Sequence, residues 1–398
     1  MDSDLIAKRK ALLAPSYRLF YDDPVHPVRG EGAYLFGADG KRYLDAYNNV
    51  VPAGHCHPRI VEAVAKQTAT LNTHTRYLHE GILDYAEALL ATFPKPLGQV
   101  TFTCTGSEAN DLAIRIARYV TGGTGIIVTE NAYHGVTATV AEISPSLGPS
   151  MPLGLHVRTV PAPGVGVDFA AGVRAAIADL LRHGIKPALL VVDTIFSSDG
   201  VAADPPGFLA PAVAAMHEAG GLFLADEVQP GFGRTGAAMW GFMRHGVAPD
   251  LVSLGKPMGN GYPVAGLVAR PEVIAEFGAK IRYFNTFGGN PVAMAAARAT
   301  LAVIQDERLM ENAAATGAYL AAGLAAHGRV RGAGLFIGLE LPGAALAARV
   351  VNGMRRRGVL ISASGPGNNV LKIRPPLVFG RTEADLLLAA LQESLADG

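Results

Sequence analysis

Residues 221–236 read GLFLADEVQPGFGRTG, and residues 250–263 read DLVSLGKPMGNGYP. In each segment a short apolar run, 221–226 or 250–255, leads directly into charged and glycine-rich sequence. Continuous apolar runs bounded by turn residues are typical of buried strands. Open α/β sheets bind their ligands at the carboxyl ends of such strands. The pattern therefore predicts that Asp226 and Lys256 each stand at the ligand-binding end of a strand.

The chemistry of these two side chains has several interpretations. Lys256 is one of nine lysines, against 25 arginines. Partial desolvation would lower its pKa and make the amine a nucleophile toward aldehydes, whereas a solvent-facing loop lysine would do nothing. Asp226 and the adjacent Glu227 fit solvated turn formers, metal ligands, or partners of a cationic ligand nitrogen. The residues alone leave these alternatives open.

Similar segments surround this pair along the chain. Apolar runs ending in turn signals occur at 98–105, 125–129, 188–193 and 264–269. Helix-period stretches lie between the runs, at 107–119, 169–181, 206–218 and 291–305. Alternation of helices with continuously apolar strands predicts an α/β fold with a large, mostly parallel sheet covered on both faces.

The two ends of the chain predict a smaller α+β domain. Residues 32–45 resemble a hairpin, a helical segment runs from 306 to about 326, and strand candidates follow at 335–341 and 370–373. We therefore predict a large domain over 45–305 and a small domain built from 1–44 and 306–398.

The composition excludes several classes of protein. Of 398 residues, 49% are apolar and 17% charged, which favours a large core. Lysine plus arginine equals aspartate plus glutamate, 34 each, so neither nucleic acid nor a membrane is an expected partner. No apolar run reaches the roughly 18 residues of a membrane span, and the polar N-terminus resembles no signal peptide. Cys56 and Cys104, without a CxxC pair, indicate a reducing compartment, and we expect a cytoplasmic protein.

Two further segments are candidates for ligand binding. In TGSEAND, 105–111, a turn opens a helix, so Gly106 and Ser107 can bind phosphate at a helix N-terminus; alternatively Ser107 is an ordinary N-cap. Tyr133 and His134 follow a strand, where an aromatic ring can stack on a flat cofactor or pack in the core.

Two other motifs resemble ligand-binding motifs but do not support a site. The GxGxxG at 231–236 is separated from its strand by DEVQP, which argues against a dinucleotide site. The histidines of GHCHP, 54–58, have no further ligand cluster, so we predict a loop and no metal site.

Taken together, these segments resemble the class III aminotransferases, which are pyridoxal 5′-phosphate (PLP) enzymes of fold type I. The resemblance rests on segments in one order at 44–58, 105–111, 132–135, 225–236, 253–263 and 284–291. It implies PLP as the cofactor and a homodimer with its active site at the subunit interface. It also implies small-molecule amine and oxo-acid substrates.

The resemblance assigns roles at matching positions. Lys256 would form a Schiff base with the cofactor aldehyde, and Asp226 would pair with the pyridinium nitrogen and keep it protonated. The other implied cofactor-binding residues are Val228 and Tyr133 on the ring, His134 next to Tyr133, Gln229 at the ring hydroxyl, Gly106 and Ser107 at the phosphate, and Thr286 of the partner subunit, also at the phosphate.

The substrate site departs from the family pattern. Many members bind the substrate carboxylate with an arginine in a motif like RIAPPL, but here the segment is LKIRPPLVF, 371–379. Lys372 takes the arginine's place and Arg374 lies two residues on. In a strand both would face the same side, which predicts an anion site.

Two reactions fit the resemblance. Segments 47–58, 71–80 and 365–377 resemble the branch containing ethanolamine-phosphate phospho-lyase and alanine–glyoxylate aminotransferase-like enzymes. Because the connection between 135 and 191 looks short for that branch, we expect transamination from an amine or amino acid to a 2-oxo acid such as pyruvate. Phosphate elimination from a substrate such as ethanolamine phosphate is the alternative. A purely binding role is disfavoured because Lys256 and Asp226 are both present.

Overall fold

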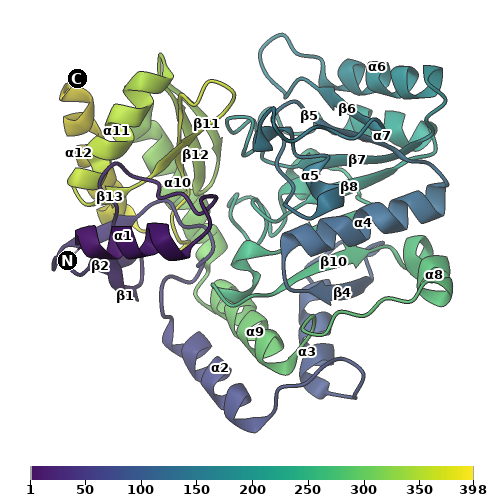
Figure 1. Ribbon diagram of the computed structural model, residues 1–398, viewed down its shortest axis with the longest axis horizontal. Helices are drawn as coiled ribbons and strands as arrows, with labels where there is room; N and C mark the ends of the chain where they lie inside the picture. The colour runs from purple at the N-terminus through teal and green to yellow at the C-terminus, as the bar shows by residue number, and fades with distance from the viewer. Residues whose placement is uncertain (1, 398) are drawn as a thin grey trace.

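The computed structural model describes residues 2–397, and its largest sheet has seven strands in the order β4-β10-β9-β8-β7-β5-β6 (Figure 1). Strand β10 is antiparallel to both neighbours, and the remaining adjacent pairs are parallel. The predicted large, mostly parallel sheet is therefore confirmed. The strands are β4 Gln99–Thr103, β5 Gly125–Thr129, β6 Val157–Val160, β7 Pro187–Asp193, β8 Leu222–Asp226, β9 Leu251–Leu254 and β10 Ala265–Ala269.

Helices cover both faces of this sheet because neighbouring strand residues point into two different cores. On β8, Leu224 packs with α4 and α8, whereas Phe223 and Ala225 belong to the core that contains α6, α7 and α9. The helices of this part are α2 Pro58–Thr70, α3 Glu80–Leu90, α4 Gly106–Thr121, α5 Ala138–Ala141, α6 Phe169–Arg182, α7 Ala210–Glu218, α8 Pro271–Lys280 and α9 Pro291–Asp306.

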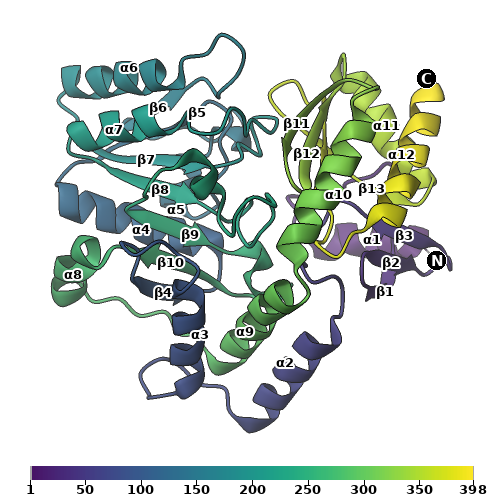
Figure 2. The ribbon, with the colours of Figure 1, turned by 180° about the vertical axis from the view of Figure 1, so that it is seen from behind.

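Two four-stranded sheets lie beside the large one (Figure 2). The sheet β1-β2-β3-β13 joins both ends of the chain, because β3 pairs in parallel with β13 and Leu44 lies opposite Val359. The predicted hairpin at 32–45 is confirmed as β2–β3. The domain boundaries near 45 and 305 stay a prediction. The elements are β1 Pro27–Glu31, β2 Tyr34–Gly37, β3 Arg42–Asp45, α10 Leu309–Leu324, β11 Arg329–Ala333, β12 Phe336–Glu340, α11 Ala344–Arg356, β13 Val359–Leu360, β14 Ser362–Ser364, β15 Val370–Ile373 and α12 Arg381–Ala396.

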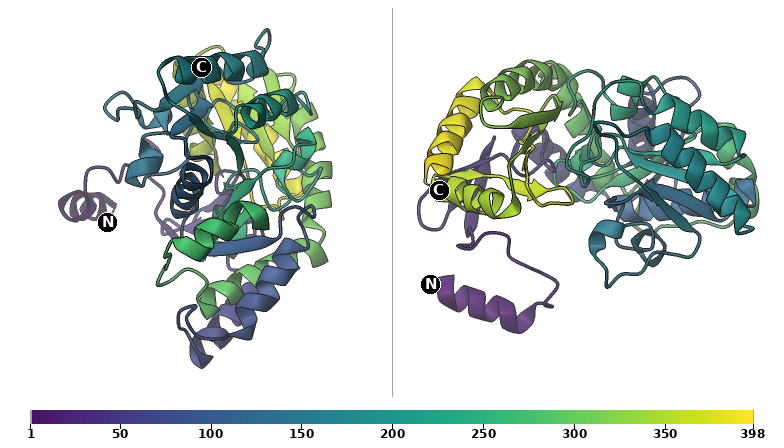
Figure 3. Two further views of the ribbon diagram at one scale, coloured as in Figure 1. Left: turned by 90° about the vertical axis from the view of Figure 1, so that its right-hand side faces the viewer. Right: turned by 90° about the horizontal axis from the view of Figure 1, so that it is seen from above.

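The N-terminal helix α1 (Asp2–Leu12) stands away from the rest of the molecule (Figure 3). Its apolar side chains are largely uncovered, with Leu5 46% and Leu12 71% exposed. Within residues 2–397 none of the helices is both long and apolar enough to cross a membrane.

Helix α7 and strand β6 are two of the elements that differ from the sequence prediction. Helix α7 begins at Ala210 and not at 206, because Gly207 adopts a φ of +90° that no helix continues, and Pro211 suits a first turn. The edge strand β6 was not predicted; only Val157 and Val160 of its four residues are buried, which leaves a weak apolar signal.

Candidate active site

Three parallel strands end side by side in the large sheet. Asp193, the last residue of β7, is the Cα partner of Asp226, the last residue of β8, and Asp226 is the partner of Ser253 on β9. Lys256 follows two residues after β9, at the start of the short helix η3 (Lys256–Gly259). The predicted pair Asp226 and Lys256 thus shares one edge of the sheet.

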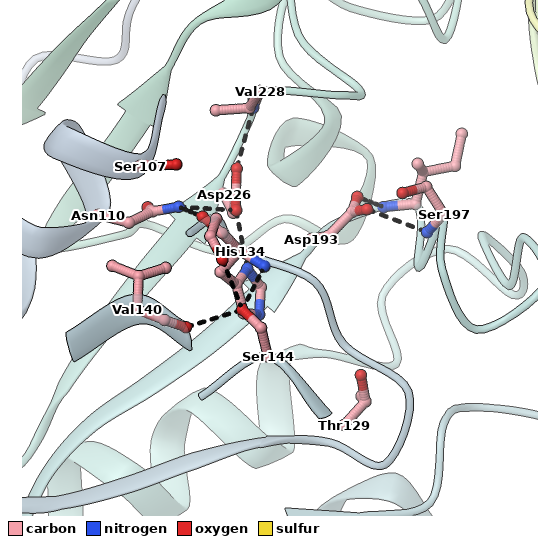
Figure 4. Close-up of polar contacts among 12 residues, drawn as sticks. Ser107, Asn110, Thr129, His134, Val140, Ser144, Asp193, Ser197, Asp226 and Val228 are labelled. Atoms are coloured by element: carbon pink, nitrogen blue, oxygen red, sulfur yellow. Dashed lines mark hydrogen bonds and ion pairs between the residues drawn. The ribbon is translucent and has the colours of Figure 1, made fainter. Parts of the chain in front are cut away.

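The Asp226 carboxylate is buried and accepts three hydrogen bonds (Figure 4). Its Oδ2 lies 2.8 Å from His134 Nδ1 and accepts from Asn110 Nδ2 at 3.1 Å, and its Oδ1 accepts from the Val228 N–H at 3.1 Å. No lysine or arginine in residues 2–397 forms an ion pair with this carboxylate. A cationic ligand nitrogen therefore fits beside it.

Glu227 has a different role from its neighbour. It is fully buried and accepts hydrogen bonds from the Thr194 hydroxyl at 2.7 Å and from the N–H groups of Gly241 and Phe242 at 2.6 and 2.8 Å. Burial raises the pKa of Glu227 to about 7. These contacts anchor the start of the short helix η2 (Gly241–His245), so Glu227 supports the fold rather than the site.

The two histidines of GHCHP pair with different carboxylates. His55 Nε2 lies 2.7 Å from Asp45, and His57 Nε2 lies 3.0 Å from Glu307. No group of three or more His, Cys, Asp or Glu side chains in the described part of the chain could hold a metal ion. Residues 231–236, which carry the GxGxxG, form turns and do not open a helix.

Lys256 combines a reactive amine with a strained backbone. Its φ of +27° is rare for a residue with a Cβ, and such strain costs roughly 1–3 kcal/mol. Burial lowers the pKa of Lys256 to about 8, and the nearby cation of Arg374 adds to this shift while Asp226 opposes it. Since that pKa leaves about a tenth of the amine unprotonated at pH 7, the group can act as a nucleophile.

Helix α4 begins at Gly106, and its N-cap is Thr105. The Thr105 hydroxyl accepts from the Glu108 N–H, and the Glu108 carboxylate accepts from the Thr105 N–H, which forms a capping box. The alternative that Ser107 is the N-cap is therefore wrong. Its Oγ instead accepts from the Val136 N–H at 3.1 Å. The first-turn amides of α4 have no partner within the helix and can bind a phosphate.

Close packing joins this helix start to the two neighbouring loops. A Cβ added to Gly106 would lie 2.8 Å from Val228 Cγ2, and one added to Gly135 would lie 2.3 Å from Ser107 Oγ. Only glycine allows these approaches. The candidate phosphate-binding turn therefore contacts both the residue that follows the β8 carboxylates and the loop that follows Tyr133.

Tyr133 and His134 flank the same carboxylate. Tyr133 is 39% exposed, and its pKa is raised by partial burial and by the negative charge of Asp226. The His134 side chain is buried, and the backbone N–H of His134 donates to Ser144 Oγ at 3.0 Å. Tyr133 is therefore partly accessible, whereas His134 supports Asp226 from within the fold.

Arg374 is a buried cation without a carboxylate partner in residues 2–397. Its Nη1 donates to Gln229 Oε1 at 3.2 Å, its guanidinium lies 4.8 Å from the ring centroid of Tyr47, and its Nε has no partner. Gln229 Oε1 also accepts from Asn49 Nδ2 at 2.7 Å. The direct contacts of the guanidinium are thus neutral groups, which leaves it free to pair with an anion.

Lys372 and Arg374 lie near each other but make different contacts. The Lys372 Nζ donates to the Ser197 carbonyl oxygen at 2.8 Å. Burial lowers its pKa well below the usual value, and Arg374 adds to the shift. The prediction that both side chains face the same side of a strand does not apply, because β15 ends at Ile373 and Arg374 lies beyond it.

Thr286 lies in an exposed segment between α8 and α9. The preceding residue, Asn285, accepts hydrogen bonds from the N–H groups of Phe287 and Gly288, and Cys104 Sγ lies 3.8 Å from its Oδ1. The segment is therefore folded into a turn beside the residues that lead into α4. Among the described residues the Thr286 side chain forms no hydrogen bond with the site residues above, and its predicted role across the interface stays a prediction.

The comparisons with known proteins agree with this arrangement. The chain matches the family model "Aminotransferase class-III" over residues 20–395. The chain belongs to the class III aminotransferases. It is 38% identical to an alanine–glyoxylate aminotransferase 2-like protein of Drosophila melanogaster, covering 99% of this chain and 87% of that protein. It is 34% identical to ethanolamine-phosphate phospho-lyase homolog 1 of Caenorhabditis elegans, covering 98% and 93%.

A solved structure is similar over the whole fold. A phospholyase from Arthrobacter in complex with phosphoethanolamine is 44% identical, with a TM-score of 0.96 and coverage of 99% of this chain and 100% of that one. The resemblance, the fold class and the assignment as an enzyme of this family are confirmed.

Class III aminotransferases are PLP-dependent, and the residues of this chain fit that cofactor. The buried Asp226 lacks a lysine or arginine partner among the described residues, as a pyridinium nitrogen requires. The first-turn N–H groups of α4, at Gly106 and Ser107, have no partner within the helix and suit a phosphate. Lys256 supplies an amine of lowered pKa at the same sheet edge.

Several residues of the site were not predicted. Asn110 supports Asp226 from α4, and Asn49 supports Gln229 from a loop that is distant in sequence. Asp193 could have been predicted, because it ends a buried apolar strand in the same way as Asp226. Nothing local marks Asn49 or Asn110, because Gln229 and Asp226, which they support, are more than 100 residues away in sequence.

Proposed function

We propose that this enzyme binds PLP and eliminates phosphate from a primary amine that carries a phosphate ester on the neighbouring carbon, such as ethanolamine phosphate. The observation that carries the proposal is the buried Arg374, a cation that forms no ion pair with a carboxylate among the described residues. It lies close enough to Lys256 for its positive charge to lower the pKa of that amine. A small amine with an anionic end fits between a lysine that acts on Cα and an arginine that holds the anion.

Each cofactor contact has a residue in this chain. When bound, PLP supplies an electron-accepting ring that stabilises negative charge developing at Cα. Lys256 attaches the cofactor and, when displaced by the substrate amine, its Nζ removes the Cα proton. Asp226 holds the ring nitrogen protonated, and Val228 and Tyr133 pack on the ring. Gln229 approaches the ring hydroxyl, and the N-terminus of α4 with Ser107 binds the phosphate.

The elimination step follows from the substrate's own bonds. After the Cα proton has moved to Lys256, the electron pair of that C–H bond forms a double bond to Cβ, and the Cβ–O bond breaks to release phosphate. Hydrolysis of the remaining enamine gives an aldehyde and ammonium. Arg374 stabilises the phosphate oxygens as their negative charge increases, so its contact strengthens toward the transition state.

The choice of phosphate elimination over transamination rests on the similarity to a phospholyase. The sequence favoured transamination because the connection between 135 and 191 looked short. The phospholyase from Arthrobacter, which bears phosphoethanolamine, matches along 99% of this chain and its own entire length. A connection of this length is therefore no argument against phosphate elimination.

Transamination is the second candidate, and a specific similarity favours it. The relative from Drosophila melanogaster at 38% identity is named for alanine–glyoxylate aminotransferase 2. In that reaction the amine donor and a 2-oxo acid such as pyruvate would be the two substrates, and Arg374 would hold a carboxylate.

The two reactions differ in their need for an acceptor. We expect purified holoenzyme to release inorganic phosphate from ethanolamine phosphate in the absence of any oxo acid, in a one-to-one ratio with ammonium. Phosphate and ammonium assays with and without pyruvate measure this. Amine consumption that requires pyruvate, without phosphate release, would instead establish the second candidate.

We propose further that the enzyme is a homodimer with Thr286 of each subunit directed to the partner's site. Exposed apolar side chains support this: Leu78 is 102%, Leu83 65% and Phe287 68% exposed, and Arg76 stacks on Phe284 to join the two segments into one surface. Apolar surfaces of this kind are typical of subunit interfaces.

Dimerisation is tested by charging this surface. Phe287→Glu is expected to shift the light-scattering mass from dimer to monomer and to lower activity by about tenfold or more, because a buried unpaired charge costs several kcal/mol. Leu386→Glu, at an apolar residue of α12 that is 44% exposed, is the matched control and should stay dimeric. A wild-type monomer with full activity at assay concentration would refute the dimer.

We also place the enzyme in the cytoplasm. Cys56 is exposed, and both cysteines are free, which suits a reducing compartment. Fractionation of the source cells with compartment markers tests this, and recovery in an oxidising compartment would contradict it.

A further inference from the structure

The segment 194–200 lies between the large sheet and the small sheet β11-β12-β15-β14 and forms hydrogen bonds with both. It follows Asp193 at the end of β7, and its Ser197 contacts residues of both sheets. Phe196 within the segment and Val201 just after it have φ values of +52° and +64°. Two strained residues so close together are maintained only where the surrounding contacts hold them.

On the side of the large sheet, Asp193 and Asp199 fix the segment, and Figure 4 shows the contacts of Asp193. Asp193 Oδ1 accepts from the Ile195 N–H at 3.1 Å, and its Oδ2 accepts from the Ser197 N–H at 3.0 Å. Asp199 Oδ2 accepts from the Thr129 hydroxyl at 2.8 Å. Because Asp193 is also the Cα partner of Asp226, the segment is fixed relative to the cofactor carboxylate.

On the side of the small sheet, the contacts converge on one carbonyl group. The Ser197 oxygen accepts from Lys372 Nζ at 2.8 Å and from Ser364 Oγ at 3.3 Å. A Cβ added to Gly200 would lie 3.5 Å from Gly365 Cα, so the backbone of the segment also packs closely on the turn between β14 and β15. Strands β14 and β15 are thereby attached to the end of β7.

The Lys372 amine is used for this hydrogen bond to the Ser197 carbonyl. Lys372 is 7% exposed, its Nζ donates to a neutral carbonyl, and no carboxylate in residues 2–397 forms an ion pair with it. Arg374, two residues on, directs its Nη1 to Gln229 and leaves its Nε without a partner. Arg374 thus has a buried N–H group without any partner among the described residues, whereas the single nitrogen of Lys372 is already bonded to the Ser197 carbonyl.

We propose that Lys372 is a positioning residue that joins the small sheet to the Ser197 carbonyl, and that Arg374 alone receives the substrate anion. The second half rests on the proposed function, whereas the first concerns the protein without substrate. The Lys372 contact sets where β15 ends relative to β7 and β8. It therefore sets the separation between Arg374 and the Asp226–Lys256 pair, and with it the length of substrate that fits.

Hydrogen exchange of the substrate-free holoenzyme tests the first half. Lys372→Met has nearly the same length but no donor, and we expect amide exchange in 194–201 to accelerate about tenfold, as loss of one buried hydrogen bond implies. Lys372→Arg can still donate to the carbonyl and should restore slow exchange. Arg374→Met, a cation lost two residues away, is the matched control and should leave this segment unchanged.

Binding of inorganic phosphate to the same holoenzymes tests the second half. Arg374→Met is expected to weaken phosphate binding by 100-fold or so, whereas Lys372→Arg should stay within about threefold of wild type. Unchanged exchange in Lys372→Met, or equal loss of phosphate binding in Lys372→Met and Arg374→Met, would overturn the proposal. If wild type binds no phosphate, the proposed function fails, and the exchange result still decides the role of Lys372.

Discussion

Replacing Lys256 by alanine is expected to remove the visible absorbance of the bound cofactor and to lower turnover by about 10⁴-fold or more. The amine is the group that attaches PLP and the base that takes the Cα proton, so two functions are lost together. Its pKa of about 8 makes it suited to both. Absorbance spectra and phosphate release with ethanolamine phosphate measure the two effects on one sample.

A second lysine provides the control for this variant. Lys280 lies on α8, is 63% exposed and pairs with Glu276, so Lys280→Ala should keep the absorbance and full turnover. Substantial turnover by Lys256→Ala, with the control behaving as expected, would show that another residue acts as the base.

Replacing Asp226 by asparagine is expected to lower kcat by 10²- to 10³-fold or so while cofactor occupancy changes much less. Asparagine can accept from His134 and Asn110 through its oxygen. Its NH₂ group then meets the Val228 N–H, which the carboxylate accepts at 3.1 Å in the wild type. The neutral side chain cannot keep the ring nitrogen protonated, so stabilisation is lost mainly in the transition state.

Glu227→Gln is the matched control for this charge removal. Glu227 is adjacent in sequence but accepts from Thr194, Gly241 and Phe242, away from the site. We expect it to change thermal stability rather than kcat. An Asp226→Asn variant with undiminished kcat would exclude the proposed pairing with the ring nitrogen.

Much of the fold could be predicted because its elements have strong local signals. The apolar runs at 221–226 and 250–255 became β8 and β9, since short buried strands between glycine and charged residues have few alternatives. The hairpin at 32–45 followed from its turn residues. The placement of Asp226 and Lys256 at one sheet edge followed from the rule that parallel strands end together.

The remaining features depend on contacts that no local pattern encodes. Thr105 rather than Ser107 caps α4, because the strand ends two residues earlier than expected and Thr105 and Glu108 satisfy each other. The direction of Lys372 is set by the Ser197 carbonyl, 175 residues away in sequence. The spacing of Lys372 and Arg374 predicted an anion site with both side chains on one side of a strand, whereas the tertiary contacts of the two side chains differ.

The most direct measurement of the central claim is borohydride reduction of the purified protein followed by peptide mapping. Reduction makes the bond between the cofactor and its lysine permanent, so mass spectrometry identifies the attached residue. We predict a single cofactor-sized mass addition on Lys256, in a stoichiometry of one per chain. An addition on any other of the nine lysines, or none in protein supplied with PLP, would contradict the account.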